Sequence, residues 1–133
     1  MKDLINFLKE NSIMYLATLG LDGKAKVRPI EFMKEISGKL YFCTNNKKLV
    51  YKELEKSPDL ELTTATPQYV WVRITGKANF TNDLKIKQVV LDSSEFVKRK
   101  FETPNHPNFA VFSIEGKAVL AGLGGSFRKK YNI

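Results

Sequence analysis

The sequence predicts a mainly β protein, an antiparallel barrel or sandwich with helices that fill its ends or gaps. Six or seven segments have the alternating or continuous apolar pattern of strands, and turn residues separate most of them. Helical segments are too few for a repeating strand–helix–strand series, which argues against a parallel sheet. The 133 residues, 43% of them hydrophobic, are expected to form one domain over residues 1–133.

The N-terminal third is expected to contain a helix, a hairpin and a third strand. Residues 2–11 place their apolar side chains on one face, as an amphipathic helix does. Residues 13–19 are almost all apolar and residues 24–33 alternate, with turn residues at 20–23 between them, so the two segments are predicted to pair. A further apolar run predicts the third strand over residues 39–44.

The middle of the chain predicts a helix followed by two strands. The helix should end near Ser57, because Pro58 disfavours a helical conformation in the residue before it. The side chains expected on its inner face are Leu49, Val50 and Leu54. Alternation then predicts a fourth strand over residues 60–64 and a long fifth strand over residues 69–80.

The C-terminal part predicts more helix and then a closing hairpin. Residues 83–101 have helical spacing, and the polar stretch at 92–94 is a candidate break. Two shorter helices and one longer helix both fit this pattern. Residues 109–114 and 117–123 read as two strands joined by a turn at Glu115 and Gly116. Residues 124–133 are expected to be a flexible extension.

The composition narrows the class of partner. Twenty-two basic and fourteen acidic residues give a net charge of +8, which favours anionic partners. No motif of the known nucleic-acid-binding classes is present, so nucleic acid is not the expected partner. No apolar run could span a bilayer, the N-terminus suits a helix better than a signal peptide, and the single Cys43 agrees with a reducing compartment; we expect a cytoplasmic protein.

An anion site is predicted where the third strand meets the second helix. Thr44, Asn45 and Asn46 can cap a helix, and the free N–H groups of its first turn would face an anion together with Lys47 and Lys48. The alternative is an ordinary capped helix with two solvated lysines.

Two other segments have features of a binding surface. Pro29 cannot donate a hydrogen bond in a sheet, so it indicates an edge, a bulge or open backbone where a ligand could dock. Trp71 and Arg73 share one side of the long strand, which is then an outer face, an interface or a ligand wall.

These parts together resemble a known family. The order of the Asp-Gly hairpin, the segment 28–32, the segment 40–46 with its paired lysines, and the segment 71–78 is similar to the pyridoxamine 5'-phosphate oxidase-like family of FMN-binding split barrels, in particular its short general-stress-protein members. The resemblance covers about residues 3–123. It implies an antiparallel split β-barrel that forms a homodimer, with two FMN molecules in clefts between the subunits.

The resemblance also implies which residues bind the cofactor. The second-strand arginine would turn its side chain to the phosphate, and the residues after it would offer backbone to the isoalloxazine. The end of the third strand and the lysines after it would hold the phosphate and the ribityl chain. Trp71 occupies the place of a glutamine that touches the flavin in the oxidase itself. The predicted cofactor-binding residues are Arg28, Pro29, Ile30, Glu31, Cys43, Thr44, Asn45, Lys47, Lys48 and Trp71.

Several functions stay open at this point. The first is an FMN-dependent oxidoreductase acting on an unidentified small molecule; pyridoxamine phosphate itself is not expected, because the chain lacks the oxidase's longer C-terminal region. The others are a flavin-binding or stress-response module without turnover, a deazaflavin binder, and a haem binder. A haem binder would need an axial ligand, and His106 is the only histidine that could supply it. His106 is otherwise expected to be a solvated loop residue. No metal-ligand spacing and no hydrolase motif is visible.

Overall fold

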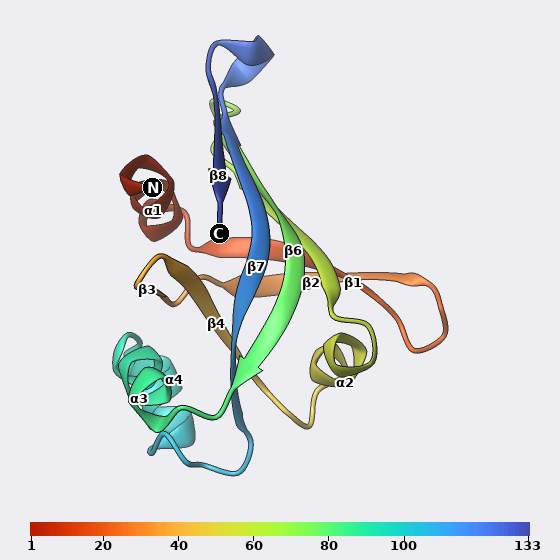
Figure 1. Cartoon of the computed structure of the whole chain (residues 1–133), viewed down its shortest axis with the longest axis vertical. Coiled ribbons are helices and arrows are strands. Elements are labelled where there is room, and N and C mark those ends of the chain that lie inside the picture. Colours follow the sequence, from red (N-terminus) through yellow and green to blue (C-terminus); the bar gives the residue numbers. More distant parts are fainter.

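One antiparallel sheet organises the molecule. The computed structural model describes all 133 residues, and its strands follow the order β2-β1-β5-β6-β7-β4-β3, with β8 also paired to β7 (Figure 1). The strands are β1 (Ile13–Leu19), β2 (Ala25–Glu31), β3 (Lys34–Ile36), β4 (Lys39–Asn45), β5 (Asp59–Ala65), β6 (Trp71–Thr81), β7 (Phe109–Ala121) and β8 (Arg128–Asn132). The helices are α1 (Lys2–Glu10), α2 (Leu49–Lys56), α3 (Leu84–Asp92) and α4 (Glu95–Phe101), with a short 3-10 turn, η1 (Leu123–Gly125). The predicted mainly β class is confirmed.

The long strand β7 is where the barrel splits. Its first half, residues 109–113, pairs with β4, while residues 117–121 pair with β8. Strand β6 runs along the other side of β7 for most of its length. Because β4 and β8 leave β7 in different directions and the β1–β2 hairpin crosses at a steep angle, the sheet forms a split antiparallel barrel (Figure 1).

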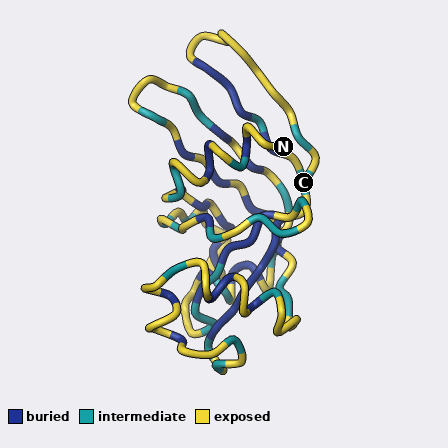
Figure 2. Tube along the Cα trace, turned by 90° about the vertical axis from the view of Figure 1, so that its left-hand side faces the viewer, coloured by how far each residue is buried: buried dark blue, intermediate teal, exposed yellow.

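Two hydrophobic cores hold the sheet. The larger core is the barrel interior, filled by alternate residues of the strands and closed by Leu4 and Leu8 of α1 and Leu54 of α2. A smaller core lies between the helices α3 and α4 and the strands β4 and β7, around Phe101 and Phe109. Figure 2 shows the buried segments concentrated along the middle of the strands, with exposed loops at both ends. Helices α1 and α2 therefore cover the barrel, whereas α3 and α4 form a separate layer.

The polar stretch at 92–94 does separate two helices. The side chain of Asp83 accepts hydrogen bonds from the first-turn amides of α3, and the side chain of Ser94 accepts one from Val97 N of α4. Each helix thus has its own N-terminal cap, which favours a break over one continuous helix.

The second helix spans the expected residues, Leu49–Lys56, but its predicted capping side chains and one residue of its predicted inner face are wrong. Helix α2 begins at Leu49 with Lys48 as its N-cap residue, and no side chain caps it. Asn45 instead accepts a hydrogen bond from Lys47 N at 2.9 Å, because a turn separates the end of β4 from the helix. Leu49 was expected on the inner face but is 63% exposed, and Glu53 occupies the buried face with Val50 and Leu54.

The predicted closing hairpin is also wrong, because residues 109–121 form one continuous strand. Gly116 lies in the middle of β7, directly opposite Gly76 of β6. A Cβ atom on Gly116 would lie 2.0 Å from the carbonyl oxygen of Thr75. The glycine permits close approach of two strands here, a role that sequence cannot distinguish from a turn.

The last ten residues are ordered in the fold and correct the expectation of a flexible extension. After η1, where Gly124 and Gly125 have positive φ, the chain returns as β8 along the second half of β7. Ile133 exchanges two backbone hydrogen bonds of 3.0 Å with Gly116. Tyr131 and Ile133 also pack against the larger core. No helix of the chain combines the length and the apolar character needed to cross a membrane.

Candidate functional site

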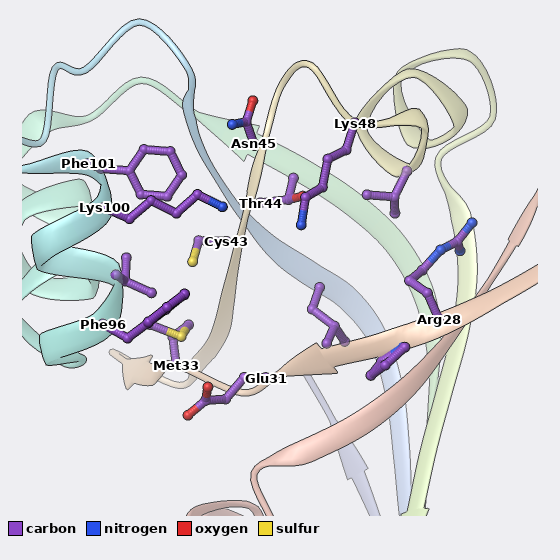
Figure 3. A pocket seen from close by; sticks show the side chains of 14 residues that line it. Arg28, Glu31, Met33, Cys43, Thr44, Asn45, Lys48, Phe96, Lys100 and Phe101 are labelled. Atoms are coloured by element: carbon purple, nitrogen blue, oxygen red, sulfur yellow. The ribbon is translucent and has the colours of Figure 1, made fainter.

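Most of the predicted site residues meet at one cavity between the two cores. It has a volume of about 220 Å³ and lies between β2, β4 and α4, beside the start of α2 (Figure 3). The predicted residues that line it are Arg28, Pro29, Ile30, Glu31, Cys43, Thr44, Asn45 and Lys48. We call this cavity the β2–β4 pocket.

Strand β2 forms one wall of the pocket because it is an edge strand. It pairs with β1 alone, and Pro29 lies opposite Tyr15 in that pairing. Of the three settings expected for Pro29, an edge, a bulge or open backbone, the structure shows an edge. Backbone groups on the free side of β2 have no neighbouring strand, so they can meet a ligand.

The charged groups in the pocket come from different elements. Figure 3 shows Lys48, just before α2, and Lys100, from α4, reaching from opposite sides toward Thr44 on β4. Neither lysine takes part in an ion pair. The first-turn amides of α2 have no side-chain cap beside Lys48. Two free ammonium groups and a hydroxyl therefore face one region of the cavity, as an anion requires.

Arg28 lines the pocket, but its guanidinium is bonded within the protein. Nη2 donates to Glu53 Oε1 at 2.5 Å, and Nη1 donates to Thr18 Oγ1 at 2.6 Å and to the Leu16 carbonyl at 3.2 Å. The Thr18 hydroxyl in turn donates to the same Glu53 oxygen at 2.8 Å. The side chain of Glu53 is only 3% exposed. Arg28 thus neutralises a buried carboxylate and ties the β1–β2 hairpin to α2.

The rest of the lining is largely apolar. Ile30 lies on β2 and Met33 just after it, Val50 comes from α2, and Phe96 and Phe101 come from α4. Phe96 is 70% exposed, an unusual setting for a phenylalanine in a helix. An apolar wall beside two cations suits a ligand that has both a ring and an acidic group.

Cys43 lies in the pocket wall without being a reactive thiol. Burial, with a smaller contribution from the charge of Glu31, raises the pKa of the Cys43 thiol to about 12. The thiol stays protonated near neutral pH, so it contributes packing and not nucleophilic chemistry.

Two predicted cofactor-binding residues lie outside the β2–β4 pocket. Lys47 is exposed in the turn before α2. Trp71 lies on the outer face of β6, where the guanidinium groups of Arg73 and Arg128 lie over its ring. A single chain therefore does not bring either residue to the cavity.

His106 is more enclosed than a solvated loop residue. Its Nδ1 accepts a hydrogen bond from Asn108 N at 3.0 Å, and its ring meets the edge of Phe101 with centroids 5.5 Å apart. It does not line the β2–β4 pocket. Nor does the chain contain any cluster of three or more His, Cys, Asp or Glu side chains that could hold a metal ion.

The sequence reasoning missed the contribution of α4. Phe96, Val97, Lys100 and Phe101 all line the pocket, although they lie about fifty residues from the nearest predicted site residue in β4. The only signal was the dense cluster of Lys98, Arg99 and Lys100. Only Lys100 of these three reaches the cavity.

Comparisons with known proteins place the chain in a family. The family model described as pyridoxamine 5'-phosphate oxidase matches residues 2–121. The chain has no match among curated proteins. Among solved structures, a NimC/NimA family protein from Clostridium acetobutylicum is similar with a TM-score of 0.86 and 26% identity, covering 100% of this chain and 92% of that one.

Two more distant structures share the fold. A pyridoxamine 5'-phosphate oxidase-related, FMN binding protein from Nostoc punctiforme has a TM-score of 0.75 at 15% identity, covering 97% of this chain and 87% of that one. A heme binding protein from Mycobacterium smegmatis has a TM-score of 0.72 at 14% identity, covering 91% of this chain and 52% of that one. Because the family model spans nearly the whole sequence, the chain belongs to the pyridoxamine 5'-phosphate oxidase family.

Proposed function

We propose that this protein is a homodimeric flavoprotein that binds one FMN per chain and uses it as an oxidoreductase on a small molecule. The observation that carries the proposal is the β2–β4 pocket itself. It combines an open strand edge at Pro29, two unpaired lysines and an apolar wall in one cavity. The similar FMN binding protein from Nostoc punctiforme supports the choice of cofactor.

The pocket residues fit the parts of FMN. The phosphate carries nearly two negative charges near neutral pH, and Lys48, Lys100 and the Thr44 hydroxyl supply donors for it. Ile30, Met33 and Phe96 offer apolar surface to the flat ring system. FMN, when bound, supplies the redox chemistry, and the protein binds it, orients it and excludes water from it.

Charge balance changes the expected role of Arg28. Its guanidinium already faces Glu53 and Thr18, so the pair contributes little net charge to the pocket. We therefore propose that Lys48 and Lys100 supply most of the attraction for the phosphate, and that Arg28 mainly shapes the wall.

We expect the double variant Lys48→Gln/Lys100→Gln to bind FMN at least about 100-fold more weakly, because a hydrogen bond to a charged group contributes about 1.5–3 kcal/mol. Titration of purified protein with FMN, followed by quenching of flavin fluorescence, measures the affinity. The matched control is Lys39→Gln/Lys85→Gln, which removes the same charge from exposed positions outside the pocket. Equal losses in both variants would show that net charge alone attracts the cofactor, and wild-type protein that stays colourless in excess FMN would overturn the proposal.

The size of the pocket supports a dimer. Its volume of about 220 Å³ is smaller than the roughly 300–1,000 Å³ typical of ligand pockets, so one chain supplies only part of an FMN site. Next to it, the outer face of the β1–β2 hairpin exposes large apolar side chains. These are Ile13, Tyr15, Leu19 and Val27, which are 52%, 52%, 48% and 69% exposed. An apolar surface of this kind usually marks an interface, and Tyr15 lies directly opposite Pro29 of the pocket wall.

Val27→Glu is expected to convert the dimer to a monomer, because it puts a charge in the centre of this apolar face. Light scattering coupled to size-exclusion chromatography reports the mass, and FMN affinity should fall with it. Val89→Glu on α3 is the control, since Val89 is also exposed, at 41%, but lies away from the hairpin. A dimer that survives Val27→Glu would assign the interface to another surface.

Turnover distinguishes the oxidoreductase from a module that only stores or senses flavin. Stopped-flow mixing of the FMN-loaded protein with NADH or NADPH should bleach the flavin rapidly if the protein is an enzyme. Failure to bleach with these and with chemically similar donors would favour the module. The family membership supports the enzyme.

The spectrum of the purified protein tests the other cofactors. A haem binder would show a Soret band, and the one histidine considered as its axial ligand, His106, lies outside the β2–β4 pocket. A deazaflavin carries a phosphate that Lys48 and Lys100 could also bind, so reconstitution with each cofactor separately compares their affinities.

A further inference from the structure

A second cavity lies on the outer face of the sheet, away from the β2–β4 pocket. It has a volume of about 450 Å³ and is lined by residues of β6, β7 and β8. None of its lining residues is shared with the β2–β4 pocket. We call it the β6–β8 cavity.

The register of three strands places cations around this cavity. Val119 of β7 lies between Arg73 of β6 and Lys130 of β8. Two residues before Val119 on β7, Lys117 lies between Thr75 and Asn132. Two residues after it, Ala121 lies between Trp71 and Arg128. The four cationic side chains that line the cavity are Arg73, Lys117, Arg128 and Lys130.

Three of these four cations lack counterions within the protein. Lys117, Arg128 and Lys130 form no ion pair, although six other basic residues do. Arg73 Nε lies 3.4 Å from Glu61 Oε1, but both of these side chains are about half exposed. Like charges on neighbouring strands repel one another, so the arrangement costs free energy unless an anion balances it.

Trp71 organises two of the cations. The guanidinium carbons of Arg73 and Arg128 lie 5.2 and 5.9 Å from the centre of its ring. Arg128 can reach the ring of Trp71 because the residue that separates the two across β7, Ala121, has only a small side chain. Stacking on an aromatic ring limits the motion of a guanidinium, which prepares both groups for an incoming ligand.

We infer that the β6–β8 cavity binds a small molecule with two or more phosphate or carboxylate groups. Its volume falls within the range of small-molecule sites, and Thr75 and Asn132 add neutral hydrogen-bonding groups to the four cations. A single-stranded nucleic acid fits less well, because such ligands need free aromatic faces for their bases and the Trp71 ring already lies beneath two guanidinium groups. The inference does not depend on the cofactor of the β2–β4 pocket.

The test uses pyrophosphate as the probe and Trp71, the single tryptophan of the chain, as the reporter. Titration at constant ionic strength should change the tryptophan fluorescence and saturate at one site per chain. Adenosine diphosphate should bind as well and adenosine should not, since the shared group is the diphosphate. Calorimetry in the presence of saturating FMN should give the same pyrophosphate affinity.

The variant Arg128→Gln/Lys130→Gln should bind pyrophosphate at least about 10-fold more weakly, because each lost charge-assisted bond is worth that much or more. Lys39→Gln/Lys85→Gln removes the same charge from exposed positions elsewhere and should keep the affinity. Circular dichroism confirms that both variants are folded. The inference is overturned if pyrophosphate does not bind, if the control loses as much affinity, if FMN displaces pyrophosphate, or if oligothymidylate binds far more tightly and with an affinity that grows with its length.

Discussion

Replacing Arg28 with methionine should lower the free energy of unfolding by about 3–5 kcal/mol, because it leaves a buried carboxylate without its partner. Glu53 is 3% exposed and shares one oxygen between Arg28 and the Thr18 hydroxyl. Without the guanidinium, that negative charge has a single neutral donor left. Urea unfolding followed by circular dichroism measures the loss.

The double variant Arg28→Met/Glu53→Met separates the ion pair from simple packing. Removing both charges should recover a large part of the stability, since a buried pair is often no better than apolar side chains of the same size. Lys26→Met on the same strand is the control, because its ion pair with Asp22 is exposed and should contribute less than about 1 kcal/mol. If Arg28→Met alone cost as little as this control, the buried pair would not hold the hairpin to α2.

This experiment also separates stability from cofactor binding. If Arg28 held the phosphate directly, replacing it would reduce FMN affinity as strongly as the loss of Lys48 and Lys100. Because its guanidinium is bonded to Glu53 and Thr18, we expect the folded molecules of the Arg28→Met variant to lose less FMN affinity than that. Comparing affinities per folded molecule distinguishes the two roles.

The strands were predictable where one face of the sheet is buried. Alternation in residues 60–64 and 71–75 matches burial residue by residue, because every second side chain of β5 and β6 enters the core. Strand β8 lacks such a signal: four of its five residues are exposed, and its position depends on pairing with β7. A strand held mainly by backbone hydrogen bonds leaves little trace in sequence.

The site was predictable only where its residues are close in sequence. The β2 and β4 segments each place several pocket residues together, so local pattern and family resemblance found them. The partner of Arg28 lies 25 residues away on α2, and Lys100 comes from a helix of the second core. Tertiary packing brings Glu53 to Arg28 and Lys100 to the pocket, and no short-range sequence pattern encodes these contacts.

The glycine pair at the centre of β6 and β7 gives the second large prediction. Gly116→Ala should lower the free energy of unfolding by about 3 kcal/mol or more, because its Cβ would lie 2.0 Å from the carbonyl oxygen of Thr75. The atom in the way belongs to the backbone, so no side-chain rotation relieves the clash. Thermal and urea unfolding measure the change.

Gly38→Ala provides the contrast that identifies the cause. Gly38 has a φ of +83° and open space around its Cβ position, so alanine there should cost only about 1 kcal/mol of conformational strain. Similar losses at both positions would show that β6 and β7 separate easily and that their close approach contributes little. A much larger loss at Gly116 would show that this approach holds the split barrel together, because Gly116 also pairs with Ile133 and thereby fixes the end of β8 beside the cations of the β6–β8 cavity.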